Sequence, residues 1–242
     1  NLLVNDRDVN CYVISPAKAI KSLTVQDDII KADAGVMLGK LVKESMKNEL
    51  TGLESLAGVP GTLGGALKMN AGAWGAEISN YLVTVDIIDS EGNFKTLRPN
   101  DLKFQYRTSS FNPHDFIISA IFKLEKSTEK KIKQKKKIAS LGRIRTQPLK
   151  YRSAGSVFKN PSSRLAAGFL IDKLGLKGTI CGEAEISTHH ANFFINHGNA
   201  KAKDIAHLIR LSRMSIFEKF GIMLDLEIKT IGFENKELFP YD

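Results

Sequence analysis

The chain has 242 residues, 43% of them hydrophobic, which is enough to bury the core of one large domain or two smaller ones. No apolar run is long enough to span a membrane and no apolar signal segment opens the chain, so we predict a soluble, cytoplasmic protein. Two isolated cysteines, Cys11 and Cys181, give neither a metal-binding spacing nor a disulfide framework, which is typical of a reducing compartment.

The net charge of +9 is concentrated in one segment. Between Lys126 and Arg152 the chain has eleven Lys or Arg residues and one acid, Glu129, whereas the charges elsewhere nearly balance. A basic helix can bind RNA or a membrane surface, but the run from Lys130 to Lys137 has no interleaved aromatic residues. We therefore interpret it as a solvated helix face, with nucleic-acid binding as the alternative.

Apolar periodicity predicts the elements of the first half in chain order. Spacing of three and four residues predicts a helix over 36–50, which ends before Gly52. The segments 82–88 and 94–97 are expected to form a hairpin across a turn at 89–92. Period-2 and continuous apolar runs predict strands at 12–14, 22–25, 29–30, 82–88, 94–97 and 116–124.

The dipeptide Gln147-Pro148 breaks the helical pattern and predicts the start of a second unit. Ser162 and Ser163 are expected to cap a helix that ends at Gly175. A second amphipathic helix should end at Gly221. The remaining segments predicted in this half are strands at 180–186, 191–196 and 223–231 and the helix at 202–220.

The stretch from Gly52 to Ile78 is rich in glycine and nearly uncharged. Glycine lets the main chain adopt positive φ and lets a ligand approach to hydrogen-bonding distance. Successive backbone N–H groups in such a loop can bind phosphate or pyrophosphate, especially where a helix follows. A structural turn is the alternative, but the small uncharged segment 69–73 could also accommodate a flat ring system.

Several polar residues are candidates for chemistry. Arg107 lies among aromatic residues and is suited to bind a carboxylate, although it could equally be a surface arginine stacked on Tyr106. Ser156 is not in a hydrolase nucleophile motif, so we interpret its hydroxyl as a possible proton donor, with Lys159 and Asn160 orienting the substrate.

Two further features concern metal binding and buried charge. His189 and His190 are adjacent on a predicted strand and should point to opposite faces, so we expect no metal site there. Glu227 lies among apolar residues, where a carboxylate is costly unless it pairs with an arginine or has a catalytic role.

Five motifs occur in one order along the chain, and together they resemble the UDP-N-acetylenolpyruvoylglucosamine reductase (MurB) family in its shorter, type II form. The motifs are Gly58-Val-Pro-Gly-Thr-Leu-Gly-Gly-Ala66 with Met69-Asn-Ala-Gly-Ala73 and Glu77, Tyr106-Arg107, Gly155-Ser-Val-Phe-Lys-Asn-Pro161, His190-Ala-Asn192, and Leu226-Glu-Ile228. The resemblance implies an α+β protein with the FAD-binding fold of the vanillyl-alcohol oxidase type and a small α/β substrate-binding domain. It implies domains at 1–147 for FAD and 148–222 for substrate, with 223–242 returning to the FAD-binding domain.

The resemblance also implies a bacterial, cytoplasmic enzyme of peptidoglycan precursor synthesis. It would use FAD and NADPH to reduce the enolpyruvyl ether of UDP-N-acetylglucosamine to UDP-N-acetylmuramate. We expect a monomer with no nucleic-acid, membrane or metal partner. Another FAD-dependent oxidoreductase of the same fold is the alternative, because it would share the glycine stretch.

Roles transfer through matched motif positions only. Ser156 would donate the proton to C2, while Arg107 and Glu227 would polarise the substrate carboxylate and stabilise the enol-like intermediate. The other substrate contacts would be Lys159 and Asn160, with Gln147 and His190 as looser matches. The implied FAD contacts are Asn1, Ala57, Gly58, Val59, Pro60, Gly61, Thr62, Gly64, Gly65, Asn70, Ala71, Gly72 and Ala73. Because only the last residue of the family's Gly-Ser-Asn turn is present, as Asn1, we expect a first subdomain to precede this chain.

Overall fold

The computed structural model describes residues 1–239 and divides into two compact units. The central unit comprises Val13–Gly142, and the terminal unit comprises Asn1–Tyr12 together with the chain from Arg143 onward. Residues 240–242, the last three of the predicted C-terminal segment, lie outside the described residues. Each unit is α+β and has its own hydrophobic core. In the described part of the chain, none of the helices has both the length and the apolar content needed to cross a membrane.

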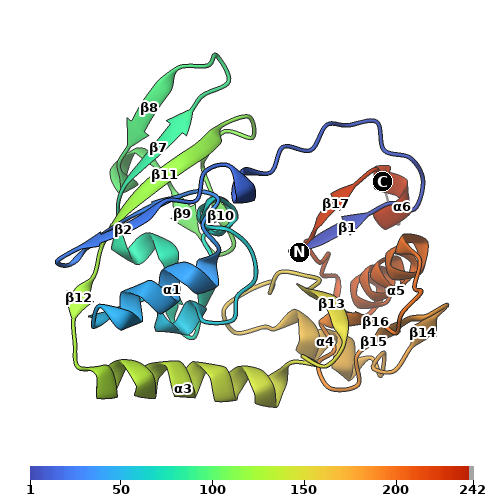
Figure 1. Cartoon of the computed structure of the whole chain (residues 1–242). Helices are drawn as coiled ribbons and strands as arrows, with labels where there is room; N and C mark the ends of the chain where they lie inside the picture. The colour runs from blue at the N-terminus through green and yellow to red at the C-terminus, as the bar shows by residue number, and fades with distance from the viewer. Residues whose placement is uncertain (240–242) are drawn as a thin grey trace. The chain divides into compact units, whose positions relative to one another are not determined.

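The central unit is built on a five-stranded antiparallel sheet of order β2-β3-β11-β7-β8 (Figure 1). Its strands are β2 (Leu23–Gln26), β3 (Ile29–Asp33), β11 (Phe116–Lys123), β7 (Leu82–Ile88) and β8 (Phe94–Leu97). The predicted hairpin at 82–97 is confirmed, and its turn is closed by hydrogen bonds from Asp89 N–H to Asn93 and from Gly92 N–H to Asp89.

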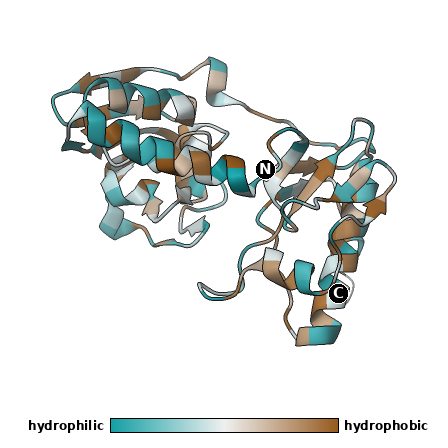
Figure 2. Ribbon diagram, turned by 90° about the horizontal axis from the view of Figure 1, so that it is seen from below, coloured by the Kyte–Doolittle hydropathy of each residue, from teal (hydrophilic) through white to brown (hydrophobic). Residues whose placement is uncertain are grey.

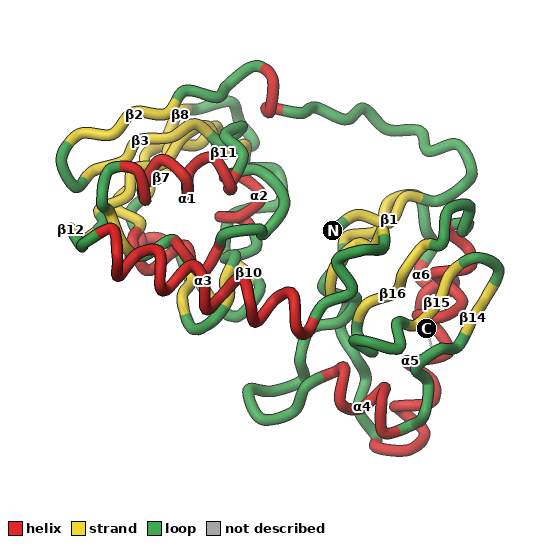
Figure 3. The backbone as a smooth tube through the Cα atoms, turned by 60° about the horizontal axis from the view of Figure 1, so that its bottom comes forward, coloured by secondary structure: helices red, strands yellow, loops and turns green. Residues whose placement is uncertain are grey.

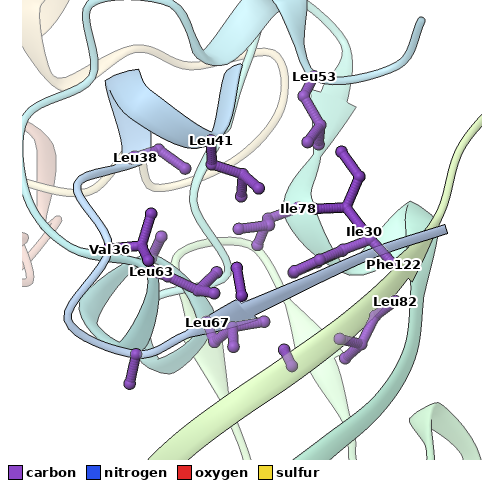
Figure 4. Packing of buried hydrophobic residues seen from close by; sticks show 14 of the residues in the cluster. Ile30, Val36, Leu38, Leu41, Leu53, Leu63, Leu67, Ile78, Leu82 and Phe122 are labelled. Atoms are coloured by element: carbon purple, nitrogen blue, oxygen red, sulfur yellow. The ribbon is translucent and has the colours of Figure 1, made fainter. Parts of the chain in front are cut away.

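Helices α1 (Leu38–Lys47) and α2 (Leu63–Lys68) bury their apolar sides against this sheet. Figure 4 shows side chains from both helices meeting those of β3, β7 and β11. The helical spacing predicted over 36–50 is therefore confirmed, since α1 buries Leu38, Leu41 and Val42. Burial of each such side chain contributes about 1.5–3 kcal/mol to the stability of the unit.

Short elements and the part of one long helix up to Gly142 complete the central unit. The long helix is α3 (Glu129–Thr146), whose buried residues are Ile132 and Ala139. Its lysine-rich first half is exposed and hydrophilic, as the teal colour in Figure 2 shows. The short elements are β4 (Leu50–Thr51), η2 (Glu54–Leu56), β5 (Gly72–Ala73), β6 (Ala76–Glu77), η3 (Ile78–Tyr81), η4 (Pro99–Asp101), β9 (Phe104–Gln105), β10 (Thr108–Ser109) and β12 (Glu125–Lys126).

The terminal unit contains a four-stranded antiparallel sheet of order β13-β16-β15-β14 and a two-stranded parallel pair, β1-β17. Helix α5 (Ala202–Phe220) has the predicted bounds and ends at Gly221, whose φ of 65° suits a left-handed cap. The other elements are β1 (Leu2–Val4), β13 (Arg152–Ser156), α4 (Ala167–Lys173), β14 (Ile180–Cys181), β15 (Ala184–Ile186), β16 (Phe193–Asn196), β17 (Lys229–Ile231) and α6 (Asn235–Leu238).

Three local predictions were wrong. The apolar run 12–14 is not a strand but part of a loop that precedes η1 (Pro16–Lys18), as the green tube in Figure 3 shows. The run 180–186 is two strands, because Gly182 turns the chain with a φ of 57°. Helix α4 begins after Ala166 without a serine cap, and its first N–H is instead bonded by the side chain of Asn160.

The segment after α5 pairs with two parts of the chain. Leu226 pairs with Phe158, and β17 pairs with β1. The predicted strand at 223–231 is also shorter, because only Lys229–Ile231 pairs as a continuous strand.

Candidate active site

The glycine stretch runs from η2 through a loop into α2, and the first residues of α2 are bonded to the segment following β3. The N–H of Leu63 donates to the carbonyl of Val36 (2.8 Å), and the N–H of Gly64 donates to the carbonyl of Ala34 (2.9 Å). A Cβ atom on Gly64 would lie 3.1 Å from that of Ala34. Glycine at this position therefore allows close packing, and its N–H is used within the protein.

Other backbone groups of the same loop are open. Gly58 and Gly61 have φ values of 82° and 115°, and no atom lies within 4 Å of a Cβ built on Gly61. Within residues 1–239, the N–H groups of Gly58, Gly61 and Thr62 have no hydrogen-bond acceptor. A pyrophosphate needs this combination of unpaired N–H groups and space above them. The residues present therefore fit the diphosphate of FAD.

The second half of the stretch is a hairpin, β5-β6, that turns at Trp74 and Gly75. Asn70, which precedes it, is fully buried and has a φ of 42°. Its Nδ2 donates to the Glu77 carboxylate (2.7 Å) and to the Gln105 carbonyl (3.1 Å), while its Oδ1 has no partner among the described residues. An unpaired buried oxygen in a left-handed residue is costly, which marks this position as more than a turn.

Arg107 lies at the turn of the β9-β10 hairpin and also has positive φ, at 55°. Its guanidinium carbon is 4.9 Å from the centroid of the Tyr106 ring, and its Nη1 lies 3.5 Å from where a Cβ on Gly72 would be. A cavity of about 460 Å³ is lined by Gly72–Glu77, Asn80, Tyr106 and Arg107. Arg107 therefore both stacks on Tyr106 and lies beside the glycine stretch.

Ser156 ends strand β13 of the terminal unit and is partly buried. The ladder with β16 shifts register between Ser153 and Ser156, and Gly155 within the shift has a φ of 84°. Such a bulge redirects the side chain that follows it. The oxygen of the Asn1 side chain lies 3.5 Å from where a Cβ on Gly155 would be, so Asn1 is brought to the residue before Ser156.

Glu227 is brought to the same place from the C-terminal segment. Its backbone N–H donates to the carbonyl of Val157 (2.8 Å), the residue after Ser156, and its side chain is 9% exposed. Lys159 N–H donates to the Asp225 carbonyl on the same ladder (2.8 Å). Ser156, Lys159 and Glu227, which are well separated in sequence, therefore lie on two directly paired segments.

The looser substrate candidates are held in different ways. Asn160 accepts a hydrogen bond from the N–H of Ala167 (3.1 Å), and Gln147 accepts one from Arg143 Nε (3.2 Å) at the end of α3. Burial lowers the pKa of His190, whose Nδ1 accepts a hydrogen bond from the N–H of Asn192 (3.2 Å). His190 is therefore neutral at pH 7.

The histidine pair is not on a strand as expected. His189 and His190 lie in the loop between β15 and β16, and both N–H groups donate to the hydroxyl of Ser187. Across residues 1–239, no group of three or more His, Cys, Asp or Glu side chains is placed to hold a metal ion.

Sequence reasoning left two buried amides without a structural role. Asn70 was assigned only as a cofactor contact, and Asn192 only as part of a motif. Asn192 is 3% exposed and bonds both the N–H and the carbonyl of Phe158. Its position between Ala191 and Phe193 was the available signal, because an amide among buried apolar residues requires partners.

Comparison with known proteins places these features in a family. Residues 2–98 match the model of an FAD-binding domain, and residues 147–231 match that of the UDP-N-acetylenolpyruvoylglucosamine reductase C-terminal domain. The α+β class and the FAD-binding fold of the vanillyl-alcohol oxidase type, both expected from the sequence, are confirmed.

Similar proteins cover nearly the whole chain. The reductase of Syntrophomonas wolfei is 38% identical over 97% of this chain and 78% of the relative, and that of Clostridium tetani is 41% identical over 96% and 75%. The crystal structure of the reductase MurB from Thermus caldophilus is 36% identical, with a TM-score of 0.82 over 96% of this chain and 82% of that one. The chain belongs to the UDP-N-acetylenolpyruvoylglucosamine reductase family.

Proposed function

We propose that this chain catalyses the NADPH-dependent reduction of UDP-N-acetylenolpyruvoylglucosamine to UDP-N-acetylmuramate, a step of peptidoglycan precursor synthesis, and that Ser156, Glu227 and Arg107 carry the chemistry. The observation that supports the roles of Ser156 and Glu227 is that the segment after Ser156 pairs with the segment that bears Glu227. A hydrogen bond from Glu227 N–H to the carbonyl of Val157 joins the segment that follows Ser156 to the segment that bears the carboxylate. The enzyme is an FAD-dependent oxidoreductase.

The cofactor would be held mainly by main-chain atoms. The N–H groups of Gly58, Gly61 and Thr62 would bind the diphosphate, and residues 70–73 would lie against the ring system. Other expected contacts are Ala57, Val59 and Pro60 in this loop, Gly64 and Gly65 at the start of α2, and Asn1. When bound, FAD accepts hydride from NADPH and supplies it to C3 of the enolpyruvyl group.

Ser156 would provide the proton that C2 of the substrate needs. A serine hydroxyl is a weak acid in water, but a strongly basic carbon at contact distance can take its proton. Its position after a bulge and beside the Glu227 segment restricts where the hydroxyl can point. The proton and the hydride together saturate the C2–C3 double bond.

Arg107 and Glu227 would act on the substrate carboxylate. Addition at C3 places negative charge on C2 and, through conjugation, on the carboxylate. A fixed guanidinium can bind that carboxylate through two N–H donors and stabilise the developing charge. The stacking of Arg107 on Tyr106 limits the motion of its side chain.

Other polar residues would orient the UDP-sugar. Lys159 and Asn160 lie three and four residues after Ser156, and neutral His190, whose Nδ1 accepts the N–H of Asn192, can donate one hydrogen bond from Nε2. Gln147 is a further candidate. We also propose that the protein acts as a monomer in the bacterial cytoplasm, without nucleic-acid or membrane partners.

A direct assay separates this function from other reactions of the fold. The purified protein should be yellow and should oxidise NADPH rapidly only when UDP-N-acetylenolpyruvoylglucosamine is supplied. The matched control is UDP-N-acetylglucosamine, which lacks the enolpyruvyl group. Equal NADPH oxidation with both sugars, or a protein that does not bind flavin, would contradict the proposal.

A further inference from the structure

The side chain of Asn192 is committed entirely to the backbone of one residue. Its Oδ1 accepts a hydrogen bond from the N–H of Phe158 (2.9 Å), and its Nδ2 donates to the carbonyl of Phe158 (2.8 Å). Asn192 is 3% exposed and Phe158 is fully buried. A side-chain amide that bonds both polar groups of one residue acts as an extra peptide unit beside that residue.

The Asn192 side chain bonds Phe158 just beyond an irregularity in the β13-β16 ladder. Register shifts between Ser153 and Ser156, and pairing resumes at Ser156 with Phe193. From there the N–H of Val157 bonds the backbone carbonyl of Asn192 (2.8 Å), and Phe158 bonds its side chain. Asn192 thus holds the two residues that follow Ser156.

The opposite edge of the same segment holds Glu227. Val157 accepts the N–H of Glu227, Lys159 donates to Asp225, and Phe158 pairs with Leu226. Residues 157–159 therefore form a segment after β13 that is hydrogen-bonded on both sides, by Asn192 on one side and by Asp225–Glu227 on the other. Displacement of Phe158 would move Ser156 and Glu227 together.

We propose that Asn192 is a positioning residue for the Ser156–Glu227 pair: it fixes Phe158 so that the hydroxyl and the carboxylate stay aligned with the substrate. The inference rests on the proposed roles of Ser156 and Glu227. Asn192 does not touch the reacting atoms in this account, because both polar groups of its side chain are used by Phe158.

Two substitutions test this in the flavin-loaded protein. Asn192→Asp keeps the acceptor for Phe158 N–H but removes the donor to its carbonyl, and Asn192→Leu removes both while preserving volume. Stopped-flow absorbance should show flavin reduction by NADPH within about twofold of the unsubstituted protein. Reoxidation by substrate should slow by about a hundredfold, because small displacements of aligned groups have effects of this order.

The matched control is Phe194→Leu on the same strand β16. Phe194 is 2% exposed and packs edge-on against Phe158, with ring centroids 6.0 Å apart. It makes neither of the two hydrogen bonds by which the Asn192 side chain holds Phe158, which we call the amide clamp. It should lower the melting temperature at least as much as Asn192→Asp and leave both half-reactions within about threefold. A loss of reoxidation in Phe194→Leu equal to that in Asn192→Asp would overturn the positioning role.

Double substitution asks whether Asn192 acts through Ser156. In a Ser156→Ala background, Asn192→Asp should slow reoxidation by less than about threefold further, because residues that act as a unit are not additive. If the double variant is slowed in reoxidation by the product of the two single effects, the proposal is contradicted.

A readout without catalysis keeps the two hypotheses separate. Amide hydrogen exchange at Phe158 should accelerate by at least tenfold in Asn192→Leu, which removes the acceptor of that N–H, and not in Phe194→Leu. Unchanged exchange would overturn the clamp even if activity is lost. If Asn192→Leu does not fold, Asn192→Ser replaces it in the same measurements. If exchange accelerates as expected but the flavin of the unsubstituted protein is never reoxidised by the substrate, the proposed function is refuted and the structural role of Asn192 stands.

Discussion

The two regions that carry the residues proposed for cofactor binding and for proton transfer are built in different ways. In the glycine stretch of the central unit, the useful groups are backbone N–H groups, made accessible by Gly58 and Gly61. In the terminal unit, the useful groups are the side chains of Ser156 and Glu227, on two segments joined by hydrogen bonds. A cofactor held by the main chain tolerates few side chains, whereas proton transfer requires particular side chains at fixed positions.

This difference predicts that substitutions in the two regions have different effects. A change in the glycine stretch should reduce cofactor binding and stability together, because the loop is itself the site. A conservative change at Glu227 should affect the reaction more than the fold, since Glu227→Gln keeps the size of the side chain and the backbone bond to Val157.

A large effect on the reaction is expected for Glu227→Gln. The amide keeps the size of the side chain and the backbone bond to Val157, but it removes the negative charge. Reoxidation of flavin by substrate should slow by about a hundredfold. Stopped-flow absorbance measures this rate, and the matched control Asp225→Asn changes an exposed carboxylate two residues away. Equal slowing in both variants would show that only the local charge matters.

Gly61→Val should damage the cofactor loop. With φ at 115°, a β-branched residue is strained there by about 1–3 kcal/mol, and its side chain would occupy the space above the open N–H groups. Urea unfolding should show the lost stability, and dialysis should remove flavin more readily. Gly39→Ala is the control, because that helical glycine has open space around it and should gain about 0.5 kcal/mol. Full flavin retention in Gly61→Val would contradict the assignment of this loop.

Much of the difference between the regions was visible in the sequence. The period of apolar residues predicted α1, α5 and the β7-β8 hairpin, because burial of one face dominates those elements. The glycine stretch was likewise evident from composition. These features depend on local patterns, so a single sequence suffices to find them.

The parts that sequence reasoning missed depend on distant contacts. The parallel pair β1-β17 joins residues more than two hundred positions apart, and no local pattern encodes this register. The roles of Asn70 and Asn192 likewise follow from hydrogen bonds to residues 35 and 34 positions away. The actual cap of α4, Asn160, was obscured by two nearer serines that fit the usual capping pattern.

A smaller effect is expected from acidification, through His190. Burial lowers its pKa below the usual 6.5, so the unfolded chain takes up a proton near that pH that the folded protein refuses. Stability should therefore fall as pH decreases from about 6.5 through the lowered pKa. In His190→Gln, urea midpoints should fall less steeply over this interval and match the unsubstituted slope above pH 7. A steeper fall in the variant would contradict a neutral His190.

The smallest effect is expected on the basic helix α3. Five exposed lysines can be changed to glutamine, while Lys135 is kept because its Nζ donates to Thr51 Oγ1 (2.9 Å). Turnover and melting temperature should stay within error, and RNA titration at low salt should show no binding before or after the change. Tight, salt-sensitive RNA binding that the substitutions abolish would establish a nucleic-acid function. The five are Lys130, Lys131, Lys133, Lys136 and Lys137.

The most direct test of the account is the pair of half-reaction rates in Ser156→Ala. Flavin reduction by NADPH should stay within about twofold of the unsubstituted protein, because the serine is assigned no role in that step. Reoxidation by UDP-N-acetylenolpyruvoylglucosamine should slow by about 10²–10⁴-fold, the usual contribution of a positioned proton donor. Equal slowing of both half-reactions, or an unchanged reoxidation rate, would show that the proton comes from another group.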